Sequence, residues 1–231
     1  MFSDDLLELS DLVDLVSRVI IVGSGYSGIE LASELDLLGI DVVVVDGSEV
    51  PMKSSNDKSS DLAFEYLKYS DIVFMGGRRV VDLFENGLQL RDGEFLESDL
   101  VVWAGGLQAS RVVQSSFDVG PSGLPVDSDF SAVDFDDVFA VGDNADHGFL
   151  KTGQNARKQG KLVGYNLGRV KSDRRFFEGG SIPLLISLGK QGIFEYGDFA
   201  FKSRFVRLVK DRVRDVYWVR LKSSRSGLSF F

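Results

Sequence analysis

The glycine-rich run over residues 23–28 constrains the fold of this 231-residue chain more than any other stretch. It follows an apolar run and is followed at once by a helical pattern, so it predicts a strand, a tight turn and a helix. In such a turn Gly23 lets the chain reverse, Gly25 lets the backbone approach a pyrophosphate, and Gly28 lets helix and strand pack closely. The phosphates would bind the free N–H groups at the positive end of the helix.

A second predicted strand, residues 40–45, ends at Asp46, eighteen residues after Gly28. An acid there accepts hydrogen bonds from the adenosine ribose and repels a 2′-phosphate, which favours NADH over NADPH. The candidate cofactor-binding residues are Gly23, Ser24, Gly25, Tyr26, Gly28 and Asp46. The alternative is a glycine-rich turn that serves only to pack the helix against the strand.

Composition excludes several classes of function. A net charge of −9 argues against nucleic-acid binding, and the absence of cysteine excludes disulfides and thiolate metal sites. The single histidine, His147, leaves little room for a metal site, so we expect none. No apolar run approaches the roughly 20 residues of a membrane span, and the acidic N-terminus does not look like a signal peptide. We therefore expect a cytoplasmic protein.

The rest of the chain predicts alternating helices and strands. Helical spacing indicates an amphipathic helix within residues 1–17 and a helix from Gly28, with Gly39 after its end. Residues 47–60 are rich in serine, aspartate and lysine and are predicted as a loop. Trp103, inside an apolar run, is predicted to lie in the core. The remaining predicted helices are 61–69 and 152–166, and the remaining predicted strands are 71–75, 79–84, 88–91, 99–104 and 138–141, with two or three more within 181–199.

The C-terminal stretch differs in charge from the rest of the chain. Residues 201–225 hold nine lysines and arginines against two aspartates, a local net charge of +7, and their apolar residues follow helical spacing. A basic amphipathic helix of this kind can lie on an anionic membrane surface. The same pattern also suits a terminal helix that docks on its own domain with its basic face in water.

Four further runs, taken with the glycine loop, carry a family resemblance: the stretch ending at Asp46, residues 92–106, residues 136–145 and residues 152–160. In this order they resemble the two-dinucleotide-fold flavoproteins, the FAD- and NAD(P)-dependent pyridine nucleotide oxidoreductases. Within that superfamily the chain is most similar to type II NADH:quinone oxidoreductases, from Arg18 to about Tyr217. The resemblance implies FAD and NADH as cofactors.

The resemblance also implies roles for individual residues. Glu30 matches the acid that orients the nicotinamide carboxamide, although a glutamate in a first helical turn also complements the helix dipole. Gly105 and Gly106 match the backbone that the nicotinamide arm passes, and Gly142 and Asp143 match the segment that hydrogen-bonds the flavin ribityl chain. Gln154 matches a glutamine beside the flavin and the quinone pocket. Glu30 and Gln154 are thus the candidate catalytic residues.

This chain departs from the family pattern in two respects: Gly153 stands where the family usually has alanine, and the family's second glycine motif, which holds the FAD pyrophosphate, has no counterpart here. The resemblance implies an α/β fold in which a Rossmann-like NAD(H)-binding domain (residues 1–125) precedes the C-terminal half of an FAD-binding domain (126–175) and C-terminal strands with a basic helix (176–231). The other half of the FAD site would come from a partner chain or a longer product. A remnant closed on itself or as a homodimer is also open.

The expected activity is that of a flavin-dependent NADH dehydrogenase that passes electrons to a quinone or a similar acceptor. Its expected place is the cytoplasm, and its basic tail would dock it on the inner face of the cell membrane. Disulfide reductases and sulfide:quinone reductases are excluded because both need thiols. The alternative is a subunit that binds NADH without turnover.

Overall fold

The computed structural model of the chain describes residues 15–180 and 182–225, with residues 214 and 217–225 described in backbone only. Two compact units are formed: unit 1 comprises Met1–Gly105 and Pro183–Phe231, and unit 2 comprises Gly106–Ile182. The expected helix within residues 1–17 falls almost entirely outside the described residues. The expected domains (1–125, 126–175 and 176–231) were divided according to the cofactor that each part would bind, and this division stays a prediction.

Unit 1 is built on a four-stranded parallel sheet in the order β3-β2-β1-β7. Its central strands are continuous apolar runs buried on both faces, as parallel strands covered by other elements require. The strands are β1 (Arg18–Val22), β2 (Asp41–Val45), β3 (Val73–Met75) and β7 (Leu100–Trp103). The sheet and its βαβ connection confirm the predicted α/β fold.

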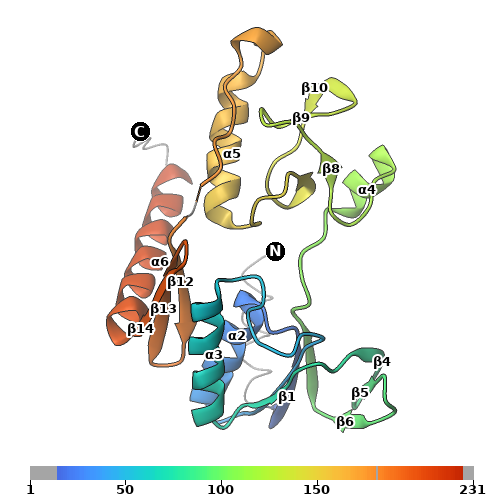
Figure 1. Ribbon diagram of the computed structural model, residues 1–231, viewed down its shortest axis with the longest axis vertical. Helices are drawn as coiled ribbons and strands as arrows, with labels where there is room; N and C mark the ends of the chain where they lie inside the picture. Colours follow the sequence, from blue (N-terminus) through green and yellow to red (C-terminus); the bar gives the residue numbers. More distant parts are fainter. Residues whose placement is uncertain (1–14, 181, 226–231) are drawn as a thin grey trace. The chain divides into compact units, whose positions relative to one another are not determined.

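Helices α2 (Tyr26–Leu37) and α3 (Asp57–Tyr69) cover one face of this sheet. An antiparallel meander covers the other face: β4 (Val80–Phe84), β5 (Gly87–Leu90) and β6 (Phe95–Glu97). Figure 1 shows the two helices and the meander on opposite sides of β1. The predicted hairpin strands are therefore confirmed, and Leu88, Leu90 and Leu96 close the core on the meander side.

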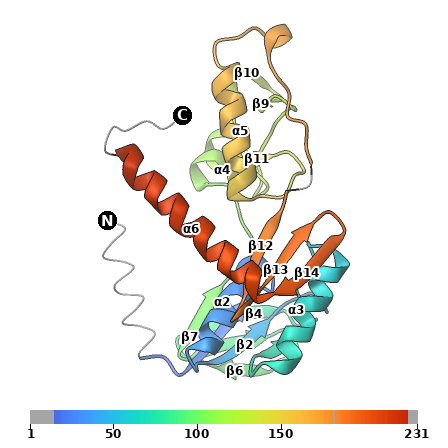
Figure 2. The ribbon, with the colours of Figure 1, turned by 90° about the vertical axis from the view of Figure 1, so that its left-hand side faces the viewer.

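A second sheet packs on α2 and α3 and extends the helix-side core. It is an antiparallel meander of β12 (Leu184–Leu188), β13 (Gln191–Tyr196) and β14 (Phe199–Ser203), and α6 (Arg204–Arg225) crosses it, as Figure 2 shows. The helical pattern predicted from Phe201 was wrong at its start, because Phe201 pairs with Phe194 in β14 and the helix begins at Arg204.

Unit 2 is less regular. It contains α4 (Arg111–Phe117), β8 (Leu124–Pro125), β9 (Ser131–Ala132), β10 (Phe135–Phe139), β11 (Ala145–Asp146), α5 (Gly153–Asn166) and two 3-10 turns, η1 (Gly142–Asn144) and η2 (Lys171–Asp173). Phe130, 1% exposed, is the largest buried side chain of its small core. Helix α5 confirms the predicted helix, whereas α4 was not predicted.

Two further predictions were wrong. The expected loop 47–60 ends early, because the Asn56 side chain accepts a hydrogen bond from the Ser59 N–H at 2.7 Å and caps a helix that starts at Asp57. Trp103 is 62% exposed instead of buried. Val101, two residues earlier on the same face of β7, packs against the meander, but Trp103 ends its strand beyond that cover.

Candidate functional site

The glycine loop has the geometry that a dinucleotide site needs. A Cβ on Gly28 would lie 1.9 Å from the Gly23 carbonyl oxygen, and one on Gly23 would lie 2.5 Å from the Ala104 carbonyl oxygen. Both glycines are therefore required by close backbone packing. A Cβ on Gly25 meets nothing within 4 Å, so the space above this residue is open. The three glycines thus serve packing at two positions and leave room for a ligand at the third.

The N-terminus of helix α2, which follows the loop, has features that favour the binding of an anion. Gly25 is the N-cap of α2 with no side-chain cap, and the first turn holds no acid that would compensate the positive end of the helix dipole. A pyrophosphate in the open space above Gly25 would supply that missing negative charge. Two observations, the open space and the uncapped helix, therefore fit the nucleotide cofactor.

Asp46 is held at the end of β2 in contact with the loop. Its Oδ2 accepts hydrogen bonds from the Ser24 backbone N–H at 2.5 Å and the Ser24 hydroxyl at 2.7 Å, and its Oδ1 accepts from the Ser48 N–H at 2.7 Å. A carboxylate has about four acceptor sites, so one remains on Oδ1 for a ribose hydroxyl. The structure thus brings Ser24 and Asp46 together, with Ser24 fixing the orientation of the acid.

Tyr26, the first residue of α2, faces the C-terminal sheet. Its hydroxyl donates to Oε1 of Glu195 on β13 at 3.2 Å, and burial together with this carboxylate raises the pKa of Tyr26 well above its usual value. Glu195 is 8% exposed, and its Oε2 has no partner within the described residues. No local pattern in the sequence marks Glu195, a single acid inside the apolar strand β13.

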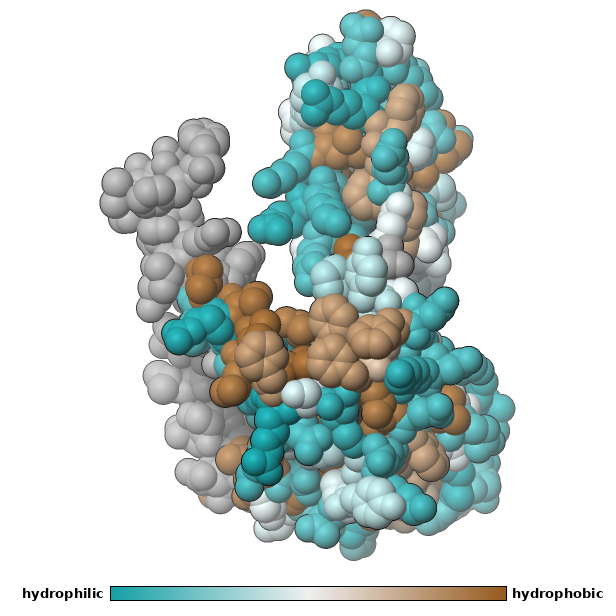
Figure 3. All heavy atoms as spheres, turned by 60° about the vertical axis from the view of Figure 1, so that its left-hand side comes forward, coloured by the Kyte–Doolittle hydropathy of each residue, from teal (hydrophilic) through white to brown (hydrophobic). Residues whose placement is uncertain are grey.

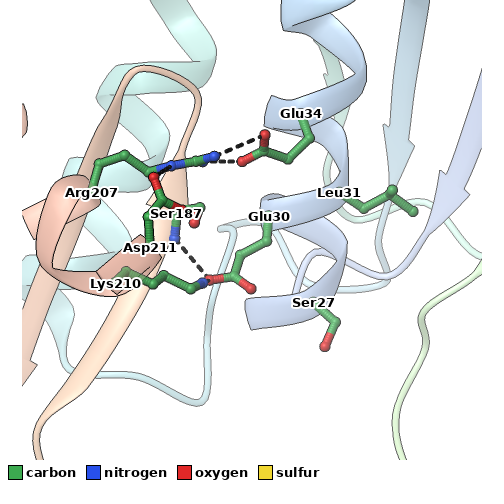
Figure 4. Close-up of a pocket in the computed structure, with 8 residues that line it drawn as sticks. All are labelled: Ser27, Glu30, Leu31, Glu34, Ser187, Arg207, Lys210 and Asp211. Atoms are coloured by element: carbon green, nitrogen blue, oxygen red, sulfur yellow. Dashed lines mark hydrogen bonds and ion pairs between the residues drawn. The ribbon is translucent and has the colours of Figure 1, made fainter. Parts of the chain in front are cut away.

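Glu30 lies one turn further along α2 and is held from two sides. Its Oε1 accepts the Ser187 backbone N–H at 2.8 Å and also a hydrogen bond from Lys210 of α6. Neighbouring Glu34 pairs with Arg207 of the same helix. These side chains line a pocket of about 490 Å³, shown in Figure 4, together with Ser27, Leu31 and Asp211. The alternative of a first-turn glutamate that complements the helix dipole was wrong, because the first turn of α2 holds no acid and Glu30 lies beyond it.

The remaining candidate residues lie on other elements than the glycine loop and α2. Gly105 and Gly106 follow β7, and a Cβ on Gly105 would lie 2.9 Å from the Trp103 indole nitrogen. Gln154 is an exposed residue in the first turn of α5 in unit 2. The catalytic role of Gln154 and the cofactor contacts of Gly105 and Gly106 stay predictions.

The expected flavin segment lies in η1 of unit 2. Gly142 donates its N–H to the Gln159 side chain at 2.7 Å. Its φ of +62 favours glycine, so the backbone conformation alone explains the glycine at this position. The Asp143 carboxylate is exposed, and its backbone carbonyl accepts from Lys151 at 2.8 Å. An exposed carboxylate fits the ribityl hydroxyls as a hydrogen-bond acceptor, so the residues present fit this part of FAD.

Within the described ranges, no group of three or more His, Cys, Asp or Glu side chains is placed so that it could hold a metal ion. Burial, with the nearby charge of Lys151, lowers the pKa of His147. In the same part of the chain, no helix combines the length and apolarity needed to cross a bilayer.

Comparison with known proteins places the chain in a family. The model of the pyridine nucleotide-disulphide oxidoreductase family matches residues 3–160. The chain belongs to this family. Members of the family typically bind FAD and NAD(P)H, and the glycine loop, Asp46 and η1 all lie inside the matched range.

Individual relatives are distant. The chain is 24% identical over 194 residues to the nitrite reductase [NAD(P)H] of Bacillus subtilis, covering 79% of this chain and 23% of that protein. It is 23% identical over 176 residues to the type II NADH:quinone oxidoreductase of Staphylococcus saprophyticus, covering 66% and 44%. The NADH-bound water-forming NADH oxidase from Lactobacillus brevis shares the fold, with a TM-score of 0.70 at 20% identity over 85% of this chain and 46% of the oxidase. The chain thus spans less than half the length of these relatives.

Proposed function

We propose that this chain is the NADH-binding part of a flavin-dependent NADH dehydrogenase that delivers electrons to a quinone or a similar acceptor. The observation that carries the proposal is the open, uncapped glycine loop next to an oriented Asp46. The family match and the distant similarity to NADH-dependent oxidoreductases support it. A bound flavin would supply the chemistry of accepting a hydride from NADH, and the protein would supply distance and orientation.

Each proposed residue has a task of binding or orientation. The α2 N-terminus would hold the pyrophosphate, Asp46 the adenosine ribose, and Glu30 the carboxamide of the nicotinamide. Asp143 would accept from the flavin ribityl hydroxyls, and Gln154 would lie at the flavin and acceptor side. The rest of the FAD site would come from a partner chain, a second copy or a longer product.

The visible absorption spectrum tests the flavin part of this proposal. The purified chain is supplied with FAD, desalted and then mixed with NADH in the absence of oxygen. A retained flavin that NADH bleaches supports the dehydrogenase and means that the chain completes its own site. A chain that binds NADH but retains no flavin, alone or with its partner, contradicts the dehydrogenase and supports the alternative of a non-catalytic NADH-binding subunit.

We also propose that α6 docks the chain on an anionic membrane surface. Four apolar side chains of this helix are exposed: Phe205 (68%), Leu208 (67%), Val213 (56%) and Val216 (46%). Figure 3 shows apolar side chains gathered on one face of the molecule, and helix α6 carries most of the basic residues of the C-terminal stretch. Apolar and cationic side chains on one exposed helix suit the interface of an anionic bilayer.

Vesicle binding measures this docking. The wild-type chain is expected to sediment with vesicles of phosphatidylglycerol and phosphatidylcholine but not with phosphatidylcholine alone, and less so at high salt. Leu208→Glu should weaken binding roughly tenfold or more, because it loses the burial of a leucine and adds a negative charge. Val112→Glu is the matched control, since Val112 is 72% exposed on α4. Equal binding of Leu208→Glu and wild type would contradict the proposal.

A further inference from the structure

Lys210 of α6 contacts Glu30 of helix α2, which lies 180 residues earlier in the chain. The two residues meet at the pocket of about 490 Å³ between α2, β12 and α6. A pocket of this size suits a small ligand group such as a nicotinamide ring. Lys210 is 28% exposed at its side chain and Glu30 is 31% exposed, so the ion pair is partly shielded from water.

The two oxygens of Glu30 are used differently. Oε1 takes both hydrogen bonds, from the Ser187 N–H and from Lys210. Figure 4 shows the second oxygen, Oε2, turned away from Lys210 and toward Ser27. Oε2 forms no hydrogen bond or ion pair within the described residues, and Glu30 lines the pocket just beyond the first turn of α2. One oxygen is therefore anchored and the other is left to accept a hydrogen bond from a ligand.

We propose that Lys210 is a positioning residue that holds Glu30 ready to accept the carboxamide N–H of the nicotinamide. The inference rests on the proposed NADH binding and adds to it a control of the nicotinamide end by the C-terminal helix. Anchoring Oε1 restricts the rotamers of Glu30 before the cofactor binds, and such preorganisation raises affinity because less freedom is lost on binding. The lysine does not touch the cofactor in this arrangement; it acts through the glutamate.

The experiment compares NADH with ADP-ribose, which keeps the adenosine and pyrophosphate but lacks the nicotinamide. Affinities are measured by calorimetry on the full chain for wild type, Lys210→Met, Lys210→Arg and Arg212→Met. Arg212, an exposed residue of α6, controls for the loss of one positive charge from the same helix. Circular dichroism checks that each variant is folded.

Lys210→Met is expected to bind NADH about fivefold more weakly and ADP-ribose as tightly as wild type, because only the nicotinamide end is affected. Lys210→Arg should restore most of the NADH affinity, and Arg212→Met should bind both ligands normally. The inference would be overturned if the ratio of the NADH and ADP-ribose affinities is unchanged in Lys210→Met, whether both affinities stay the same or both fall equally. Wild-type protein that binds neither ligand would overturn the proposed function itself.

Discussion

Gly28→Ala is expected to destabilise unit 1 by about 3 kcal/mol and to abolish NADH binding. The new methyl would lie 1.9 Å from the Gly23 carbonyl oxygen and 3.0 Å from its carbonyl carbon, and both are backbone atoms that no rotamer change can move. Relief requires α2 to move away from β1, which breaks the packing of Ile29 and Ala32, both buried in the core. Thermal unfolding followed by circular dichroism measures the loss.

Gly25→Ala is the matched control for that substitution. The added methyl meets nothing within 4 Å, and the φ of −66° suits alanine, so stability should change by less than about 1 kcal/mol. The methyl would instead occupy the space proposed for the pyrophosphate, and we expect NADH affinity to fall at least roughly tenfold. A stable Gly25→Ala variant with normal NADH affinity would show that this space is not the cofactor site. An unaffected melting temperature in Gly28→Ala would refute the packing argument.

Arg174→Met is expected to unfold unit 2 locally, at a cost of about 3–5 kcal/mol, because it leaves a buried carboxylate without its cation. Arg174 Nη1 lies 3.1 Å from Oδ2 of Asp129, and the two side chains are 8% and 0% exposed. Asp129 also accepts from the Ser131 N–H at 3.1 Å and the Ser131 hydroxyl at 2.6 Å. Hydrogen exchange of the amides of unit 2 measures the loss.

Acid adds a second readout for the same pair. Burial disfavours the charged form of Asp129, but the hydrogen bonds of Ser131 and the charge of Arg174 outweigh burial and lower its pKa. The stabilisation is therefore fully present above about pH 4, the pKa in the unfolded chain, and is lost as the pH falls through the lower folded value. In Arg174→Met the acid transition should move to higher pH.

The control for this prediction removes the whole pair. Asp129→Leu with Arg174→Met leaves no buried charge behind, so the double variant should recover much of the stability lost by Arg174→Met alone. If Arg174→Met exchanges its unit 2 amides as slowly as wild type, the buried pair is not what holds this unit together.

Local patterns predicted the elements of unit 1 because their causes are local. The apolar runs of β1 and β2 require burial on both faces, and glycine turns separate the strands of the meander. Gly39, which follows the end of α2 with φ +79, matches the predicted helix end. The start of α3 was missed because its first turn is rich in serine and aspartate, residues equally common in loops and at helix N-termini.

The contacts around helix α2 could not be predicted, because the residues that form them are far apart in sequence. Tyr26 and Glu195 are separated by 169 residues, and Glu30 and Lys210 by 180. Lys210 was one basic residue among nine in the C-terminal stretch, and nothing local marked it as the partner of an acid on α2. These contacts depend on the packing of the sheet β12–β14 on α2 and α3, which only the folded chain determines.

Calorimetric titration of the wild-type chain and Asp46→Arg with NADH and NADPH measures whether Asp46 selects NADH. We expect wild type to bind NADH at least roughly tenfold more tightly than NADPH, because Asp46 accepts from the ribose and repels a 2′-phosphate. Asp46→Arg should lose NADH affinity and shift its preference toward NADPH. Equal binding of both cofactors by wild type, no binding of either, or an unchanged preference in Asp46→Arg would contradict the proposed NADH site.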